Sequence, residues 1–576
     1  MATATATQQL RQRQIEQAEE LLFSGPQKAG FAKDLFFGRF RTESIMPYPA
    51  LSAAEQAKAD QAVGAVRDFV EHHLDAVRID READIPRDVI LGLGRVGLMG
   101  AAVSPEYGGR GLSQQIYCRM MEVIGGHCGS TAVFVNAHHS IGLRALQIFG
   151  TTEQKQRWLP GLATGEQLAA FALTEPEAGS DAANVRTRAV PTADGKGYVL
   201  NGQKRYITNG GIAQVLTVMA RTPDPSDPDG KVTAFLVTPD MPGFEVVEAR
   251  MEKVGIRGTA TSKLAFHDMF VPKENILGEI GKGLRLALTM LDFGRTTFGA
   301  SCTGAAKVCI QRAVEYANER RQFGRTLGEF ELTKEKIALA AADTFAMESA
   351  TYHTAALIDS GAEDYMLETS MLKVFASDAL WRIVNDTLQI HGGAGFFTDR
   401  PFERMMRDAR LNTIGEGANE VLRCFNCMVG LRNVGRELEG IIKRPWTVAK
   451  ILRSAPTIPV SHSFLQPAAG ALSRQILAFS RACRWALIKF REEILEQQCL
   501  QARLGDVATE LFHSSCVYSR LSALASGNDY DEDLRQRDLQ TGLFYLKCAH
   551  RRNAQRLAAL SDNDDLEQLK TANAWL

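Results

Sequence analysis

The chain has 576 residues, of which 45% are hydrophobic and 23% are charged, so it can bury large cores and should divide into about three or four domains. Its 66 Lys and Arg residues nearly balance its 67 Asp and Glu residues, which excludes the general positive field that collects nucleic acid. No run of about 18 apolar residues is present, so no membrane-spanning helix is predicted. The 10 cysteines are scattered, as is typical of reduced thiols.

Residues 1–58 predict a polar N-terminal leader. Its first part lacks the apolar core of a secretory signal, and the glutamates Glu16, Glu19 and Glu20 are unusual for a transit peptide, which is poor in acids. We therefore expect a retained helical leader on a cytoplasmic protein, with peripheral attachment to the inner membrane face as a further expectation. The alternative is a processed protein on the mitochondrial matrix side.

Residues 59–170 carry apolar residues at helical spacing and predict an α-helical N-terminal domain. Within them, the run from Gly92 to Gly97 matches the dinucleotide-binding pattern G-x-G-x-x-G. That pattern needs a strand before its first glycine, whereas Ile85-Pro86 indicates the start of a helix. We interpret the motif as a helix that ends in glycines, which argues against a nicotinamide cofactor.

Residues 171–282 contain short runs rich in β-branched and aromatic residues, which predict an antiparallel β middle domain. Asn201-Gly202, in YVLNGQKRYI, favours a tight hairpin turn. Helical spacing returns in residues 283–432, the predicted helical-bundle C-terminal domain, and continues through a helical extension in residues 433–576. The order helix, sheet, helix predicts an α+β multidomain protein rather than a doubly wound parallel sheet.

Four loop-like segments combine glycine with polar and aromatic residues: FALTEPEAGSD, RYITNGG, ERRQFG and QIHGGAGF. Taken alone, each is typical of a solvated loop or helix end. Together they indicate a large, flat, polar cofactor held between a β domain and a helical one, because they offer hydroxyls, a charge suited to phosphate and backbone that a ligand can approach.

An acidic residue stands between two glycines in TIGEGANEVLR. Glu416 is flanked by Gly415 and Gly417, so a ligand can approach its backbone closely. The alternative is an ordinary acid near a helix N-terminus, where the helix dipole stabilises negative charge.

Six motifs, in this order, resemble the acyl-CoA dehydrogenase family: FALTEPEAGSD, NGQKRYITNGG, ANERRQFGRTL, LQIHGGAGF, MMRDAR and IGEGANEVLR. The resemblance covers roughly residues 60–430. The leader and the helical extension resemble the very-long-chain branch of the family, including its relative linked to assembly of respiratory complex I.

The resemblance implies FAD as cofactor and the oxidation of medium-to-long-chain acyl-CoA to trans-2-enoyl-CoA in fatty acid β-oxidation. It implies that Glu416 removes the α-proton of the thioester while the β-hydrogen leaves as hydride to the flavin. Some relatives carry their base at the position of Gly294, which has no side chain here. Of these two positions, only that of Glu416 has an acidic side chain, so Glu416 is the candidate base.

The resemblance also assigns binding residues. Those implied to bind the cofactor are Phe171, Leu173, Thr174, Gly179, Ser180, Tyr206, Ile207, Thr208, Arg320, Gln322, Phe323, Gln389, Gly392, Gly393, Ala418, Asn419 and Glu420. Those expected to line the substrate site are Ser180, Asp292, Arg295, Gly415 and Gly417. For Asp292 and Arg295, a structural ion pair is the alternative.

The family's usual electron acceptor is electron-transfer flavoprotein. A homo-oligomer, expected to be a dimer, follows because Arg320, Gln322 and Phe323 match a contact to the FAD of a neighbouring subunit. One rival function is an acyl-CoA oxidase that passes electrons to oxygen. The other is an assembly or scaffold protein that retains a dehydrogenase body.

No metal site is expected, because the adjacent His138 and His139 point about 100° apart on a helix and share no ligand face. Val133 to Ala137 contains no large charged residue, which favours a deep acyl tunnel. Gly415 and Ala418 depart from the family, which usually has an aromatic residue and a threonine there.

Residues 440–453 interleave apolar and basic side chains, a composition suited to a membrane interface. A linker packed on its own protein is the alternative. Farther on, apolar residues recur at helical spacing from Ile476 to Ile494 and predict a packed helix.

Overall fold

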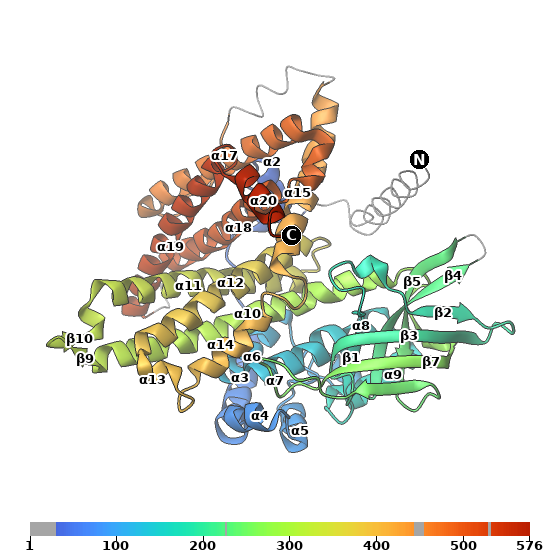
Figure 1. The fold of residues 1–576 in the computed structure, drawn as a ribbon. Coiled ribbons are helices and arrows are strands. Elements are labelled where there is room, and N and C mark those ends of the chain that lie inside the picture. The colour runs from blue at the N-terminus through green and yellow to red at the C-terminus, as the bar shows by residue number, and fades with distance from the viewer. Residues whose placement is uncertain (1–29, 225–226, 443–453, 528–530) are drawn as a thin grey trace. The chain divides into compact units, whose positions relative to one another are not determined.

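The computed structural model describes residues 30–224, 227–442, 454–527 and 531–576 (Figure 1). No helix in these ranges is long and apolar enough to cross a membrane.

The described chain forms two compact units. The first unit comprises Leu51–Ala305 and Phe397–Asn412. The second comprises residues 30–50, Ala306–Phe396 and Thr413–Leu576.

The first unit is helical before its sheet. Its helices are α3 (Ala53–His73), α4 (Ala76–Glu82), α5 (Arg87–Arg95), α6 (Gln114–His127), α7 (Gly129–Val135), the π-helix Asn136–Leu143, α8 (Arg144–Phe149), α9 (Thr152–Ala163), the first part of α10 (Gly283–Glu319) and α14 (Phe402–Leu411). Local sequence sets several helix starts. At α3, Ser52 accepts from the backbone N–H of Glu55, and the Glu55 carboxylate accepts from the backbone N–H of Ser52.

The glycine motif lies at the end of a helix, as the sequence predicted. Helix α5 begins directly after Pro86 and ends at Arg95, and Gly97 then adopts a φ of 78°. A left-handed residue just after a helix is a common terminator, and glycine adopts it without steric cost. The interpretation of this motif as a helix end is confirmed.

One sheet completes the first unit, with strands in the order β6-β7-β3-β2-β4-β5-β8 and β1 paired to β4. Its strands are β1 (Ala169–Ala172), β2 (Arg188–Pro191), β3 (Gly197–Thr208), β4 (Val215–Asp224), β5 (Asp227–Val237), β6 (Phe244–Glu248), β7 (Thr261–Pro272) and β8 (Ile276–Leu277). The predicted β middle domain between helical regions is confirmed, and most of its strand pairings are antiparallel. The pairings of β1 and β2 with β4 are parallel, so the sheet is mixed.

The predicted hairpin turn at Asn201-Gly202 is wrong. Both residues lie inside the continuous strand β3, where Asn201 pairs with Arg188 of β2. The pairing of β3 with β7 shifts register between Leu200 and Gly202, which marks a bulge. The Asn201 side chain donates to the Asp268 carboxylate and accepts from the Asp268 backbone N–H, so Asn201 bridges two strands instead of turning the chain.

The second unit is almost entirely helical. Its elements are α2 (Phe31–Phe37), the second part of α10, β9 (Arg321–Gln322), β10 (Arg325–Thr326), α11 (Glu331–Asp359), α12 (Met366–His391), α13 (Gly393–Phe396), α15 (Asn419–Ile442), α17 (Gln466–Phe490), α18 (Gln498–Ser526), α19 (Glu532–Ala558) and α20 (Asp565–Asn573). Helices α18 and α19 run side by side, and α11 packs on both (Figure 1). The predicted apolar stripe is buried at Ile476, Phe479 and Cys483 of α17.

Part of the predicted leader packs inside this unit. In α2 the Phe36 ring meets Phe479 of α17 edge-on, with 4.9 Å between ring centroids. A Cβ added at Gly430 of α15 would lie 2.3 Å from the Phe36 ring, so glycine is what lets the two elements approach. The Ala32 backbone N–H donates to Glu368 Oε1 at 2.8 Å. Burial and the nearby Asp364 carboxylate together raise the pKa of Glu368 to about 7.

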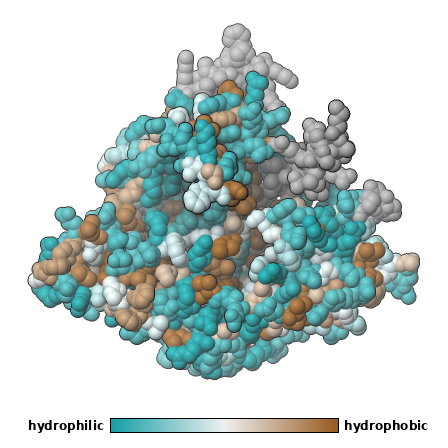
Figure 2. Space-filling view, in the orientation of Figure 1, coloured by the Kyte–Doolittle hydropathy of each residue, from teal (hydrophilic) through white to brown (hydrophobic). Residues whose placement is uncertain are grey.

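Hydrophobic residues are scattered among hydrophilic ones on the face that Figure 2 shows. The buried hydrophobic residues of the first unit include a cluster on the sheet, built around Leu200, Leu216, Phe235 and Phe266. This core fixes the strands from which the predicted cofactor segments emerge.

Candidate active site

Glu416 has an unusual backbone conformation. Its φ is 56°, and Gly417 follows with a φ of 105°. The left-handed region costs a non-glycine residue about 1–3 kcal/mol and persists only where the surroundings impose it, which is common at functional sites. The Glu416 Oε2 atom is buried. A carboxyl group is thus held in a strained and partly enclosed position.

Lys373 and Asn419 hold this turn in place through hydrogen bonds. Lys373 of α12, which is fully buried, donates from Nζ to the Gly417 carbonyl at 2.6 Å and to Asn419 Oδ1 at 2.8 Å. The backbone N–H of Asn419 donates to the Thr413 carbonyl at 3.1 Å and closes residues 413–419 into a loop. The Asn419 side chain also donates to Ser377 and Asp378, so it is engaged within the protein rather than directed at a ligand.

In the first unit, the predicted cofactor segments are tied together by a buried ion pair. Lys204 of β3 donates from Nζ to Glu175 Oε1 at 2.7 Å and to the Leu173 carbonyl at 3.0 Å. Glu175 also accepts from the backbone N–H of Arg186 and from the N–H and hydroxyl of Thr187. Although burial raises the pKa of Glu175, the Lys204 charge and these donors lower it below its usual value.

A second strained residue lies near the end of the same strand. Tyr206 has a φ of 61°, and the pairing of β3 with β7 shifts register between Lys204 and Ile207. The Tyr206 side chain is 57% exposed and Thr208 is half-buried, whereas Ile207 points into the sheet core. Tyr206 and Thr208 therefore both remain accessible, and Ile207 can offer a ligand only its backbone.

The remaining residues predicted in the FALTEPEAGSD segment follow β1. Phe171 lies in that strand, Leu173 and Thr174 are half-buried just after it, and Ser180 is exposed. A Cβ added at Gly179 would meet nothing within 4 Å, so a ligand can approach the backbone there.

The predicted residues of the second unit outside the Glu416 loop lie on its surface. Arg320 is exposed at the end of α10, Gln322 is exposed in β9, and Phe323 is 92% exposed with a φ of 53°. Gln389 is exposed near the end of α12. A Cβ added at Gly392 or Gly393 would meet nothing within 4 Å.

Asp292 and Arg295, two of the residues expected to line the substrate site, are buried. Arg295 and Asp292 of α10 approach to 3.8 Å, one helical turn apart, so the alternative of an ion pair is present in the structure.

The π-helix that follows Val135 buries both His138 and His139. His138 Nδ1 accepts from the Ala169 backbone N–H at the start of β1, and His138 Nε2 donates to the Leu162 carbonyl. Burial lowers the pKa of His138 to about 4, so it is neutral at pH 7.

The donor sets in each unit suit FAD. A flavin needs accessible aromatic and apolar surface for its ring, and its phosphates need hydroxyl, backbone N–H and arginine donors. Tyr206, Thr174 and Ser180 offer these in the first unit, and Phe323 and Arg320 offer them in the second. Among the described residues, three of the eight non-glycine residues with positive φ are predicted site residues, namely Tyr206, Phe323 and Glu416, and strain of this kind concentrates at functional sites.

Sequence reasoning missed the residues that hold these segments in place. Glu175 and Lys204 lie inside the quoted motifs, but charged residues are usually exposed, so nothing local marks them as a buried pair. Lys373 and Arg423 were also missed, because their partners lie more than 40 residues away along the chain.

Four family models match the chain. They are "Acyl-CoA dehydrogenase, N-terminal domain" over residues 56–166, "Acyl-CoA dehydrogenase, middle domain" over residues 170–269, "Acyl-CoA dehydrogenase, C-terminal domain" over residues 281–425, and "ACAD9/ACADV, C-terminal domain" over residues 463–574. Together they span most of the chain, the extension included.

Individual relatives agree. The very long-chain specific acyl-CoA dehydrogenase of Mus musculus, named as mitochondrial, is 36% identical over 85% of this chain and 78% of its own length. A solved acyl-CoA dehydrogenase from Bacillus anthracis, complexed with FAD, has a TM-score of 0.82 at 28% identity and covers 95% of this chain and 94% of that one. Butyryl-CoA dehydrogenase from Megasphaera elsdenii has a TM-score of 0.63 at 34% identity, over 67% of this chain and 100% of that one. The chain belongs to the acyl-CoA dehydrogenase family, in the branch that carries the very-long-chain type of C-terminal extension.

Proposed function

We propose that this protein oxidises medium-to-long-chain acyl-CoA to trans-2-enoyl-CoA, with Glu416 as the base that removes the α-proton. The reaction class, FAD-dependent acyl-CoA dehydrogenation in β-oxidation, is that of the family. The single observation that carries the role of Glu416 is its strained position between two glycines, with Oε2 buried. A carboxylate kept in such a conformation requires support from its surroundings, and Lys373 and Asn419 supply it.

The chemistry needs a base and a positioned donor. The α-proton of a thioester is weakly acidic, so its removal requires stabilisation of the developing negative charge on the carbonyl oxygen. We assign the base to the Glu416 carboxylate and the donor to the Glu416 backbone N–H. FAD, when bound, supplies the acceptor for the β-hydride. In the first unit, Thr174, Ser180, Tyr206 and Thr208 would hold it, because their side chains are exposed or half-buried.

The partner and the assembly belong to the same proposal. We assign electron-transfer flavoprotein as the electron acceptor on the family resemblance. A homodimer is supported by exposed apolar side chains in the second unit, since Phe323 is 92%, Leu332 75% and Phe396 75% exposed. Arg320, Gln322 and Phe323 would contact the FAD of the second copy.

Domain bounds and location complete the proposal. We propose that the domains end at residues 58, 170, 282 and 432. Peripheral attachment to a membrane would occur through residues 440–453, of which 443–453 lie outside the described residues. The mammalian relatives are named as mitochondrial, which supports a matrix-side location for a protein of this type.

Replacing Glu416 by glutamine tests the assignment. The variant should bind FAD with unchanged affinity and lose flavin bleaching by saturated acyl-CoA under anaerobic conditions, by about 10³-fold or more, because the base is gone. The matched control is Glu493→Gln, an exposed acid outside the predicted site, which should bleach at the wild-type rate. Substantial bleaching by the Glu416→Gln protein would refute the role.

The same assay separates the rival functions. A series of acyl-CoAs of increasing chain length reports chain preference, and stoichiometric peroxide during aerobic turnover would identify an oxidase. A scaffold protein without activity would show no bleaching by any acyl-CoA.

A further inference from the structure

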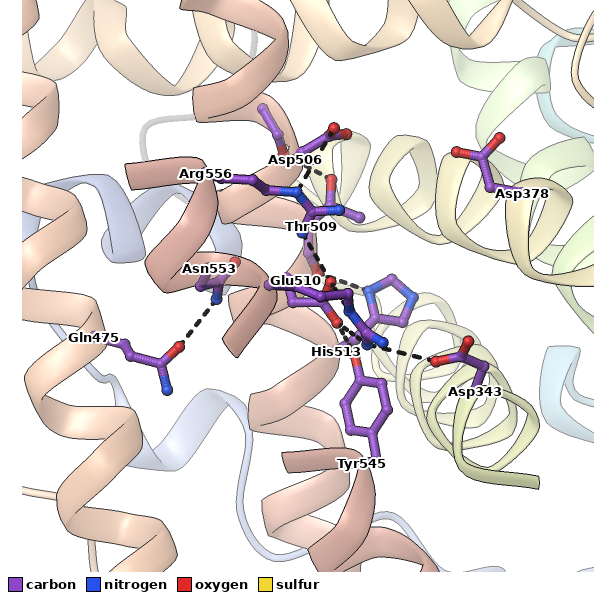
Figure 3. A network of polar contacts seen from close by, with 12 residues as sticks. Asp343, Asp378, Gln475, Asp506, Thr509, Glu510, His513, Tyr545, Asn553 and Arg556 are labelled. Carbon is purple, nitrogen blue, oxygen red and sulfur yellow. Dashed lines mark hydrogen bonds and ion pairs between the residues drawn. The ribbon is translucent and has the colours of Figure 1, made fainter. Parts of the chain in front are cut away.

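A chain of polar contacts in the second unit leads from the C-terminal extension to the Glu416 loop. It begins at Glu510 of α18, a buried carboxylate that accepts from Arg552 and Arg556 of α19 and from the Tyr545 hydroxyl at 2.8 Å (Figure 3). Although burial raises the pKa of Glu510, the two arginines lower it to about 2. This cluster locks α18 to α19.

One turn earlier on α18, Asp506 points toward Arg423 of α15. The Arg423 Nε donates to Asp506 Oδ1 at 2.8 Å, and its guanidinium also donates to Asp378 of α12. Burial lowers the pKa of Arg423, but the Asp506 and Asp378 carboxylates outweigh this effect and raise it. A guanidinium with two carboxylate partners on different helices is fixed in place by both.

From Asp378 the contacts reach the loop itself. Asp378 Oδ1 accepts from the Asn419 side chain at 2.8 Å. Asn419 Oδ1 accepts from Lys373, and Lys373 donates to the Gly417 carbonyl next to Glu416. Every step from Asp506 to Gly417 is a hydrogen bond or ion pair between groups that are buried or half-buried.

The backbones also approach closely at this point. A Cβ added at Gly505, the residue before Asp506, would lie 2.3 Å from the Arg423 carbonyl. Glycine is therefore required for α18 to lie so near α15. This second observation places the extension against the first turns of the helix that follows the Glu416 loop.

We propose that Asp506 of the extension is a positioning residue for Glu416, acting through Arg423, Asp378 and Asn419. The extension thus sets the conformation of the catalytic loop as well as adding packing surface. Asp506 touches no substrate. Its effect on the reaction is to keep Arg423 in the orientation that lets Asp378 hold Asn419. This inference rests on the proposed role of Glu416 as the base.

The test compares two ion pairs that each include one residue of α18. Asp506→Asn removes the carboxylate charge that pairs with Arg423 and, at 3.9 Å, with Arg556. Asp565→Asn removes the charge that pairs with Arg503, in a pair of similar exposure that does not lead to the loop. Asp506→Glu is the rescue variant, because it restores the charge. All three are made in the full-length, FAD-loaded protein.

Two readouts are measured. The rate of flavin reduction at saturating acyl-CoA should fall about 3- to 30-fold in Asp506→Asn with little change in KM, and should recover in Asp506→Glu. Hydrogen exchange of the backbone amides in residues 413–422, followed by mass spectrometry without substrate, should speed up in Asp506→Asn only. Combining Asp506→Asn with Arg423→Gln should add nothing to the effect of Arg423→Gln alone, because both changes break the same path.

The outcomes separate this inference from the proposed function. Equal rates and equal exchange in Asp506→Asn and Asp565→Asn would overturn the inference while the Glu416→Gln result stood. Full activity of Glu416→Gln would overturn the proposed base, whatever the exchange data showed. Equal losses of thermal stability in both aspartate variants, with a rate change only in Asp506→Asn, would support the positioning role over a general structural one.

Discussion

The Nζ atom of Lys204 lies 2.7 Å from Oε1 of Glu175, in a pair whose side chains are 0% and 4% exposed. Replacing Lys204 by methionine would leave the Glu175 carboxylate buried with its main charge partner removed. We expect the free energy of unfolding to fall by about 3–5 kcal/mol, because an uncompensated buried charge is costly. Urea denaturation followed by far-UV circular dichroism measures the change.

The control for that variant is Lys196→Met. Lys196 pairs with Asp194 at 3.7 Å, but the two side chains are 78% and 55% exposed, so the free energy of unfolding should change far less than in Lys204→Met. FAD affinity should also weaken in Lys204→Met, because Lys204 holds the Leu173 carbonyl at the start of the predicted cofactor loop. Equal midpoints for Lys204→Met and the wild type would contradict the prediction.

Two glycine substitutions should have opposite effects on stability. Gly505→Ala should destabilise the protein by about 1–3 kcal/mol, because the new Cβ would meet the Arg423 carbonyl and force α18 away from α15. Gly435→Ala, in α15, should stabilise by about 0.5–1 kcal/mol, because its Cβ would meet nothing within 4 Å and alanine favours helix. Thermal midpoints of the two variants check both signs, and a stabilised Gly505→Ala would contradict the close approach.

The stability of the protein should depend on His513 at mildly acidic pH. Burial lowers the pKa of His513 to about 4, and its ring stacks on Phe375. Below its usual pKa of about 6.5, the unfolded chain binds a proton that the folded protein does not, so stability present above pH 6.5 is lost as the pH falls toward about 4.

His513→Phe keeps a stacking ring without the titration. Relative to wild type, it should gain up to about 3 kcal/mol of stability as the pH falls through this range. Burial also raises the pKa of Glu368 and Asp408, so these acids stabilise the folded protein as the pH falls and oppose the effect of His513. Their contribution is the same in both proteins, so the difference in stability between His513→Phe and the wild type is the quantity to compare. Urea unfolding at several pH values measures it. A pH-independent difference would show that His513 is not the titrating group.

The segment 440–453 remains a sequence-based prediction. Replacing Lys443, Arg444, Lys450 and Arg453 by glutamate should release the protein from anionic vesicles, since each basic residue contributes about 1 kcal/mol near such a surface. Vesicle flotation measures the bound fraction, with uncharged lipid as the control. Unchanged flotation would favour the alternative of a linker packed on the protein.

Periodicity and caps predicted the order of helices and strands, because those signals are local. Pro86 and the following glycines identified the helix at the dinucleotide-like motif correctly. Asn201-Gly202 was misread, since pairing of β3 with strands on both sides overrode the turn preference of two residues. Long-range pairing also explains why Lys373 was missed, because its contact with the Gly417 carbonyl joins residues 44 positions apart.

The site itself was predictable only in part. The family motifs located Glu416 and the cofactor loops, but the backbone angles that distinguish Tyr206, Phe323 and Glu416 arise from their surroundings. A sequence pattern specifies which residues stand at a site, whereas strain and burial depend on how distant segments meet.

The contact of Phe36 with Phe479 has a practical consequence for shortening the chain. A version that ended near residue 440 would lose α17 and leave the Phe36 ring, now fully buried, facing water. Exposed aromatic surface of this kind promotes aggregation. Residues 30–50 and the C-terminal extension must therefore be retained or removed together when this enzyme is shortened for crystallisation or engineering.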